Sequence, residues 1–69
     1  MDATQLTAIS PHELGQRLQE ARKRRGLTQE EAASAIGLAR TTMVAIEKGE
    51  RRMRANELLQ LAQVYGQSV

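Results

Sequence analysis

The sequence predicts an all-α fold, a compact bundle of four to five short helices. Three observations predict it. Apolar residues recur at helical spacing in successive stretches, capping residues and glycines bracket each stretch, and no alternating strand pattern or internal repeat appears. With 69 residues the chain is long enough for one domain and short for a deep core.

The first helix is predicted to begin at Ser10, which can cap it, with Pro11 in the first helical position. Glu13 can reach back to complete a capping box. Gly26 follows where a helix would end in a left-handed residue. Between these signals a single apolar stripe recurs at i, i+4 and i+7, formed by Leu14, Leu18 and Ala21.

The second helix is predicted to start after Thr28, because Thr28 and Glu31 form another capping box. Its narrow apolar face is made of Ala32, Ala33 and Ile36. The alanines are small enough to let a neighbouring helix approach closely. Gly37 then ends this helix after little more than two turns.

The third helix is predicted to begin at Ala39 or Arg40 and to cover residues 40–48, ending at Gly49. Met43 and Ile46 are its inward positions, with Thr42 and Glu47 partly inward. Leu38 and Met43 have the spacing of a hydrophobic staple. Ala39 stands where a polar cap is usual, which lowers helix stability by about 1 kcal/mol.

Residues 51–56 are predicted to be a polar, basic connection to a fourth helix, which ends at Gly66. The apolar positions of that helix are Leu58, Leu61, Ala62 and Tyr65. The domain is therefore expected over residues 10–66. Residues 1–9 are expected to form a flexible arm, and residues 67–69 to begin a further helix or a linker.

Several function classes are excluded by composition. No cysteine is present, which excludes disulfides and thiolate metal sites. His12 is the only histidine, so neither a paired-histidine metal site nor a Ser-His-Asp triad can form. We therefore expect no enzyme activity, no metal and no cofactor. No apolar run approaches the roughly 18 residues of a membrane span, and no secretory signal appears. A soluble, cytoplasmic domain without membrane contact is expected.

The net charge is only +2, but the basic residues are clustered. One cluster covers residues 22–25, and the other contains Arg51, Arg52 and Arg54. Two clusters flanking a central pair of helices would suit a polyanion. Such clusters are more often solvated surface charge.

The second and third predicted helices, joined by a tight turn, have the pattern of a helix-turn-helix. This motif requires a small residue inside its first helix, a glycine at the turn and an apolar residue inside its second helix. Ala33, Gly37 and Ile46 meet these three conditions. The combination predicts a DNA-binding domain.

The stretches "GLTQEEAA" (residues 26–33) and "IEKGER" (residues 46–51) resemble the lambda-repressor-like, xenobiotic-response-element family of helix-turn-helix domains. The resemblance covers about Leu14 to Tyr65. It implies a bundle of about five helices that binds double-stranded DNA, usually as a homodimer on a pseudo-palindromic site. It also implies transcription regulation of the kind found in N-terminal modules of bacterial and phage regulators.

Residues 40–48 would then be the recognition helix in the major groove. Arg40 can contact guanine O6 and N7, although a phosphate contact or a solvated side chain is the plainer alternative. The resemblance places base contacts at Thr41 and Ala45 also, and Ala45 could equally serve only to leave space. Val44 is either a thymine contact or an edge of the core.

Phosphate contacts are expected around this helix. Gln29 resembles a family position that bonds the DNA backbone, and helix N-termini attract phosphate in any case. Further candidates are Thr28, Thr42, Lys48, Arg51, Arg52 and Arg54. The resemblance also assigns Arg22 and Glu47 to a largely buried structural ion pair, which removes Arg22 from the DNA contacts.

The main alternative function is a protein-interaction, dimerisation or antitoxin-type adaptor module. Its working surface would be an exposed apolar patch around Leu59 and Val64. The C-terminal stretch also resembles regulators in which a zinc-metallopeptidase-like domain follows. A C-terminal domain beyond Val69 is therefore a further expectation.

Overall fold

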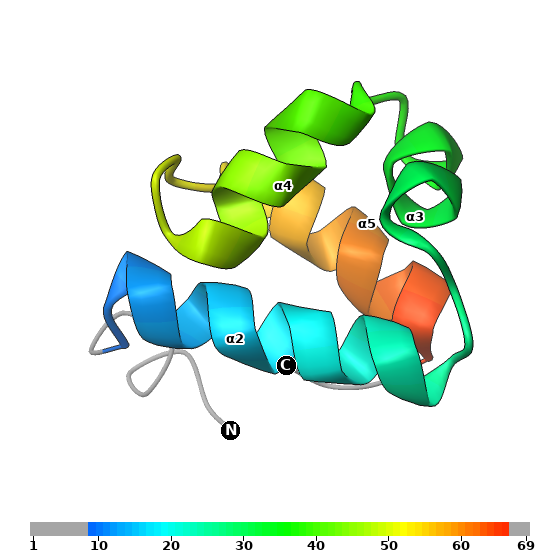
Figure 1. Cartoon of the computed structure of the whole chain (residues 1–69), viewed down its shortest axis with the longest axis horizontal. Coiled ribbons are helices and arrows are strands. Elements are labelled where there is room, and N and C mark those ends of the chain that lie inside the picture. Colours follow the sequence, from blue (N-terminus) through cyan, green and yellow to red (C-terminus); the bar gives the residue numbers. More distant parts are fainter. Residues whose placement is uncertain (1–8, 67–69) are drawn as a thin grey trace.

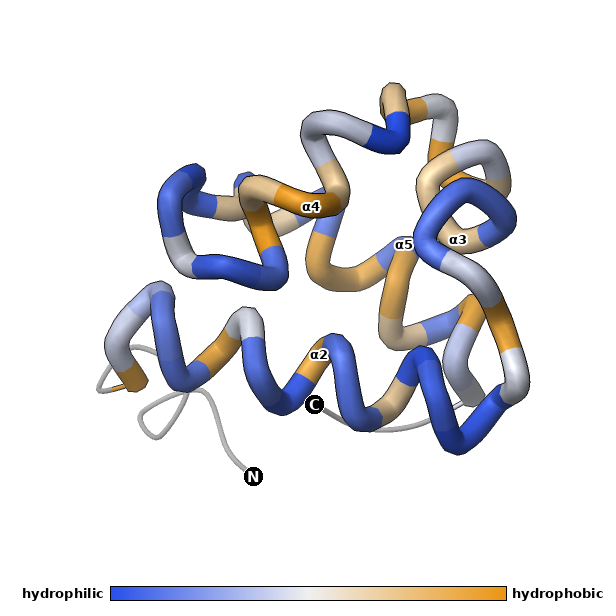
Figure 2. Tube along the Cα trace, in the orientation of Figure 1, coloured by the Kyte–Doolittle hydropathy of each residue, from blue (hydrophilic) through white to orange (hydrophobic). Residues whose placement is uncertain are grey.

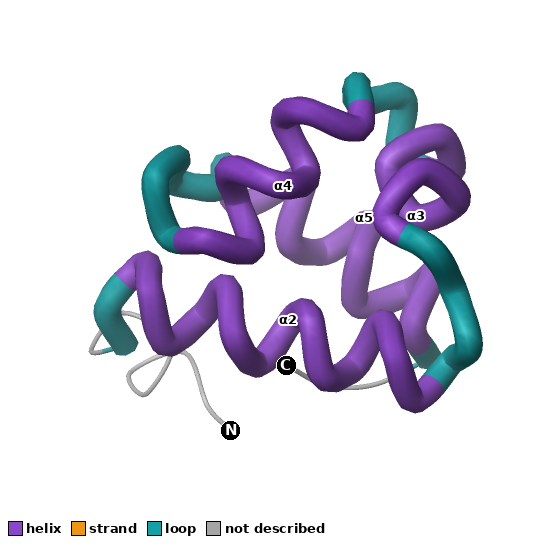
Figure 3. The backbone as a smooth tube through the Cα atoms, viewed as in Figure 1, coloured by secondary structure: helices purple, strands orange, loops and turns teal. Residues whose placement is uncertain are grey.

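The computed structural model describes residues 9–66, and within this range the chain forms four helices and no strand. They are α2 (Pro11–Arg24), α3 (Gln29–Ala35), α4 (Arg40–Lys48) and α5 (Ala55–Tyr65) (Figure 1). Short loops join them (Figure 3). The predicted all-α class is confirmed. Nearly all of the arm expected over residues 1–9, and the whole continuation expected over residues 67–69, lie outside the described residues.

The helix starts follow the local capping chemistry. The Glu13 N–H donates to Ser10 Oγ at 3.1 Å, but no return bond to the exposed Glu13 carboxylate forms within the described chain, so the predicted capping box is half formed. At α3 the box is complete: the Glu31 N–H donates to Thr28 Oγ1 at 3.0 Å, and the Thr28 N–H donates to Glu31 Oε1 at 2.9 Å. Ala39 gives α4 no side-chain cap, as the sequence predicts.

The start of α5 differs from the prediction. The helix begins at Ala55, inside the stretch 51–56 that was expected to be a connection. The reason is Glu57, whose Oε1 accepts the Arg54 N–H at 2.9 Å. A glutamate in the third helical position satisfies a backbone donor at the helix start and so extends the helix toward the N-terminus.

The core lies where the four helices meet. Its buried members are contributed by all four helices: Leu18, Ala21, Ala32, Ala33, Met43, Ile46, Leu61 and Tyr65. Figure 2 shows that α2 is mostly hydrophilic, with isolated hydrophobic segments, so it contributes a narrow stripe rather than a whole face. The small side chains of Ala32 and Ala33 let α3 pack closely against its neighbours.

Two glycines fix the contact between α2 and α4. A Cβ placed on Gly15 would lie 2.5 Å from the carbonyl oxygen of Glu47, so α2 can approach α4 only because this position has no side chain. Gly49 ends α4 with a φ of +77°, and a Cβ there would lie 2.6 Å from His12 Cα. The C-terminal half of α4 is thereby anchored on α2, as Figure 1 shows.

Candidate nucleic-acid interface

Helix α4 has one buried face and one open face. Met43, Ile46 and Glu47 point inward and are buried. At 3.6 residues per turn, the positions between them must face outward. That open face is formed by Arg40, Thr41 and Lys48, which are exposed, and by Thr42, Val44 and Ala45, which are half-buried. All four residues predicted to contact bases therefore lie on α4, whose opposite face is packed against the rest of the domain.

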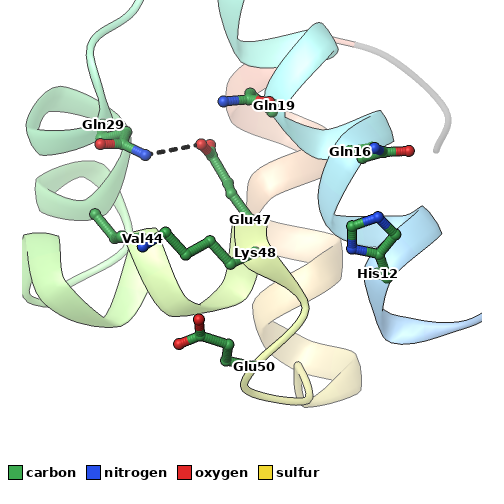
Figure 4. Close-up of a pocket in the computed structure, with 8 residues that line it drawn as sticks. All are labelled: His12, Gln16, Gln19, Gln29, Val44, Glu47, Lys48 and Glu50. Atoms are coloured by element: carbon green, nitrogen blue, oxygen red, sulfur yellow. Dashed lines mark hydrogen bonds between the residues drawn. The ribbon is translucent and has the colours of Figure 1, made fainter.

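A hollow borders this face on the α2 side (Figure 4). Its α2 wall contains three polar residues spaced at i, i+4 and i+7, namely His12, Gln16 and Gln19. The opposite wall is formed by Val44, Glu47 and Lys48 of α4, with Gln29 of α3 and Glu50 completing the lining. Val44 is half-buried and lines this hollow.

A second hollow lies at the start of the helix-turn-helix. It brings Arg40 of α4 together with the N-cap residue Thr28, with Gln29 and Glu30 of α3, and with Arg22 of α2. Gln29 lines both hollows. Three of the predicted contacts, Arg40, Thr28 and Gln29, therefore surround one hollow, whereas Val44 and Lys48 border the other.

Beneath these hollows lies a buried polar network centred on Glu47. Arg22 Nε donates to Glu47 Oε2 at 2.7 Å, and a second Arg22 nitrogen donates to Glu47 Oε1 at 3.2 Å. Arg22 also donates to the Leu27 carbonyl oxygen at 2.7 Å, and Gln29 Nε2 donates to Glu47 Oε1 at 3.0 Å (Figure 4). The hydrogen bond to Glu47 raises the pKa of Arg22 above its ordinary value. This network joins α2, α3 and α4, so it fixes how α4 sits on the bundle.

The basic cluster after α4 is divided by its hydrogen bonds. Arg52 and Arg54 are exposed. Arg51 instead donates through both terminal nitrogens to the two carboxylate oxygens of Glu57, each at 3.1 Å. These bonds lower the pKa of Glu57, and the Arg54 N–H adds to the effect. The three arginines that looked equivalent in the sequence therefore differ, because the charge of Arg51 is already paired.

Sequence reasoning missed Glu57 and the bond between Gln29 and Glu47. A signal for Glu57 was present, since a glutamate just before an apolar helical stripe is typical of a capped helix start. No local signal could have shown that Glu57 is buried beside Arg51, because that contact depends on how the connection folds back.

No helix between residues 9 and 66 is long and apolar enough to cross a membrane. In the same range no three His, Asp or Glu side chains are grouped so that they could hold a metal ion.

The order of two short helices, a turn at Gly37 and an exposed second helix defines a helix-turn-helix domain. The family model described as a helix-turn-helix domain matches residues 13–69, and the chain belongs to that family. It is thus a DNA-binding domain of the kind found in transcription regulators, which confirms the class predicted from the sequence.

Two relatives support this assignment. The chain is 34% identical to the restriction-modification controller protein C.AhdI of Aeromonas hydrophila, whose crystal structure superposes with a TM-score of 0.80 over 86% of each chain. It is also 53% identical over 32 residues to an uncharacterized HTH-type transcriptional regulator of Methanothermobacter thermautotrophicus. That match spans 46% of this chain and 46% of the archaeal regulator.

Proposed function

We propose that this domain binds double-stranded DNA in a sequence-specific way, with α4 in the major groove, and regulates transcription. The observation that carries the proposal is the two-faced character of α4. Its inner face is fixed by Met43, Ile46 and the Glu47 network, while Arg40 and Thr41 are exposed in its first turn. A rigid helix with an accessible N-terminal half suits a major groove about 12 Å wide.

The base contacts are assigned by chemistry. Arg40 offers a planar guanidinium that can bond guanine O6 and N7 together. Thr41, Val44 and Ala45 offer methyl groups that can pack on the C5-methyl group of thymine. Because Val44 and Ala45 are half-buried, their contacts require the helix to lie deep in the groove.

The phosphate contacts lie around this helix. The Gln29 amide nitrogen carries two hydrogens and gives one to Glu47, so the other is available for a phosphate oxygen. The remaining rim donors are Thr28, Thr42, Lys48, Arg52 and Arg54. Such contacts set the register of the protein on the duplex without reading sequence.

We propose further that the domain acts as a homodimer on a pseudo-palindromic site. Leu59 of α5 supports this proposal, because it is 66% exposed. It is the one large apolar residue within residues 9–66 that is exposed. The same residue keeps the adaptor function as a second candidate. Val64 does not extend that surface as expected, since it is partly buried and packs against the core.

The test is selection of bound sequences from a randomised duplex library at moderate salt. The wild type is compared with Arg40→Ala and with Arg25→Ala, which removes the same charge beside Gly66 at the C-terminal end of α5. We expect a two-fold symmetric motif that changes with Arg40→Ala and is unchanged with Arg25→Ala. The affected base pair should lose about 1–3 kcal/mol of discrimination.

Other outcomes separate the alternatives. Binding without enrichment of any sequence motif would mean that the domain contacts only the DNA phosphates and does not read sequence. The adaptor function would be favoured instead by two results together. The domain would bind no DNA even at low salt, and Leu59→Gln would abolish binding to a protein partner.

A further inference from the structure

One carboxylate, that of Glu57, links the two ends of the basic connection 51–54 between α4 and α5. Glu57 accepts two hydrogen bonds from the Arg51 guanidinium and a third from the Arg54 N–H. Arg51 also donates to the Arg52 carbonyl oxygen at 3.4 Å. The two ends of the stretch 51–54 are thus tied to the same buried side chain.

The geometry of this tie is that of a bidentate arginine–carboxylate pair. Such pairs match two parallel N–H groups to two oxygens, and arginine binds a phosphate in the same way. The Glu57 carboxylate therefore occupies the part of Arg51 that a DNA phosphate would use. The Glu57 side chain is only 10% exposed, so solvent does not compete strongly for it.

The two neighbouring arginines are in the opposite situation. Arg52 and Arg54 have exposed side chains, and the backbone between them is held at Met53, which packs against the core. Fixing this backbone limits the directions in which the two side chains extend. A phosphate contact from a held backbone loses less conformational entropy than one from a free loop.

From these contacts we propose that Glu57 is a positioning residue for DNA binding. It withholds Arg51 from the DNA phosphates, and it holds the connection so that Arg52 and Arg54 contact those phosphates. This inference rests on the proposed function and refines it. The lowered pKa of Glu57 agrees with a carboxylate that stays ionised and paired at neutral pH.

The inference is tested by the salt dependence of binding to one selected duplex. Each phosphate contact contributes about 0.9 to the slope of log K against log salt. We expect Arg52→Ala and Arg54→Ala each to lower the slope by about that amount, and Arg51→Ala to leave it unchanged. Circular dichroism at the assay temperature verifies that every variant is folded.

Glu57→Gln gives the opposite signature. Glutamine can still accept the Arg54 N–H, as in other capping boxes, but it releases the Arg51 charge. The slope should therefore rise, by up to about 0.9, and the double variant with Arg51→Ala should return to the wild-type slope. Glu20→Gln is the matched control, because it makes the same change in net charge at an exposed glutamate of α2 that lines neither hollow.

The outcomes distinguish the two proposals. If Arg51→Ala lowers the slope as much as Arg52→Ala does, or if Glu57→Gln changes it no more than Glu20→Gln, the positioning role is overturned while DNA binding stands. If the wild type shows no salt-dependent binding, the proposed function itself fails and this inference with it.

Discussion

Two bidentate arginine–glutamate pairs lie in different parts of the domain. The Arg22–Glu47 pair joins α2 to α4, and its side chains are 8% and 2% exposed. The Arg51–Glu57 pair closes the connection to α5, with side chains 33% and 10% exposed. The two pairs share one chemistry, and their surroundings decide what each pair contributes.

Because the Arg22–Glu47 pair is buried, the stability of the fold depends on it. Charges removed from water are tolerated only when their hydrogen-bonding capacity is satisfied, and here Leu27 and Gln29 supply the remaining partners. In the second pair the Arg51 side chain is one-third exposed, so solvent screens this pair more than the first. We therefore expect the first pair to affect stability and the second to affect binding.

The largest expected effect is that of Glu47→Ala. It leaves the Arg22 guanidinium buried without its partner, and the free energy of unfolding should fall by about 3–5 kcal/mol. Urea denaturation followed by circular dichroism measures this. Replacing both partners by apolar residues, as in Arg22→Met with Glu47→Leu, should recover most of the loss.

The control for this prediction is Glu50→Ala, which removes an exposed carboxylate close by in the sequence. We expect it to change stability by less than about 0.5 kcal/mol. If Glu47→Ala costs no more than Glu50→Ala, the buried pair does not carry the fold and the contrast between the two pairs disappears.

A smaller effect is expected at the second pair, and it depends on pH. The bonds from Arg51 and from the Arg54 N–H lower the pKa of Glu57 in the folded state. A carboxyl with a lowered pKa contributes stability above its unfolded value of about 4.3, and this contribution is lost as the pH falls below that value. Because Arg51 is one-third exposed, the contribution should be about 1 kcal/mol or less.

Thermal melts of the wild type and Glu57→Gln from neutral to strongly acidic pH measure this contribution. The gap between the two melting temperatures should be widest at neutral pH and should close in acid. Glu50→Gln should run parallel to the wild type throughout. A gap that widens toward low pH would reverse the sign and contradict the pairing.

The sequence was sufficient for the features that depend on neighbouring residues. Thr28 and Glu31 predicted the start of α3, and Gly49 predicted the end of α4, because capping and left-handed turns are local. The anchored positions Met43 and Ile46 followed from helical spacing in the same way.

What could not be predicted depends on tertiary approach. The function of Gly15 as the contact point between α2 and α4 appears only once the two helices are packed. Arg51 could not be separated from Arg52 and Arg54, because the partner of a long side chain is chosen by the folded chain. Whether α4 reads bases, and with which residues, stays a prediction until the selection experiment.

The smallest expected effect concerns Tyr65, which is fully buried near the first pair. Its hydroxyl is the one buried side-chain polar atom within residues 9–66 that has no hydrogen-bond partner. Burial, aided by the nearby Glu47 charge, raises the pKa of Tyr65 to about 12, while Arg22 acts in the opposite direction. The two charges therefore partly cancel at this site, which is what a buried ion pair must do to be tolerated beside an apolar core.

Tyr65→Phe removes the unpaired hydroxyl and keeps the ring, so stability at neutral pH should stay within about 0.5 kcal/mol of the wild type or rise slightly. The difference should appear in alkali. Because burial disfavours the ionised form, the wild type should lose stability as the pH rises from the unfolded pKa of about 10 toward 12, whereas Tyr65→Phe should not. Absorbance titration of the single tyrosine, with melts of both proteins, measures both effects. A loss of more than about 1 kcal/mol at neutral pH would mean that the hydroxyl has a partner, and that the polar network around Glu47 reaches further into the core than the Arg22 pair.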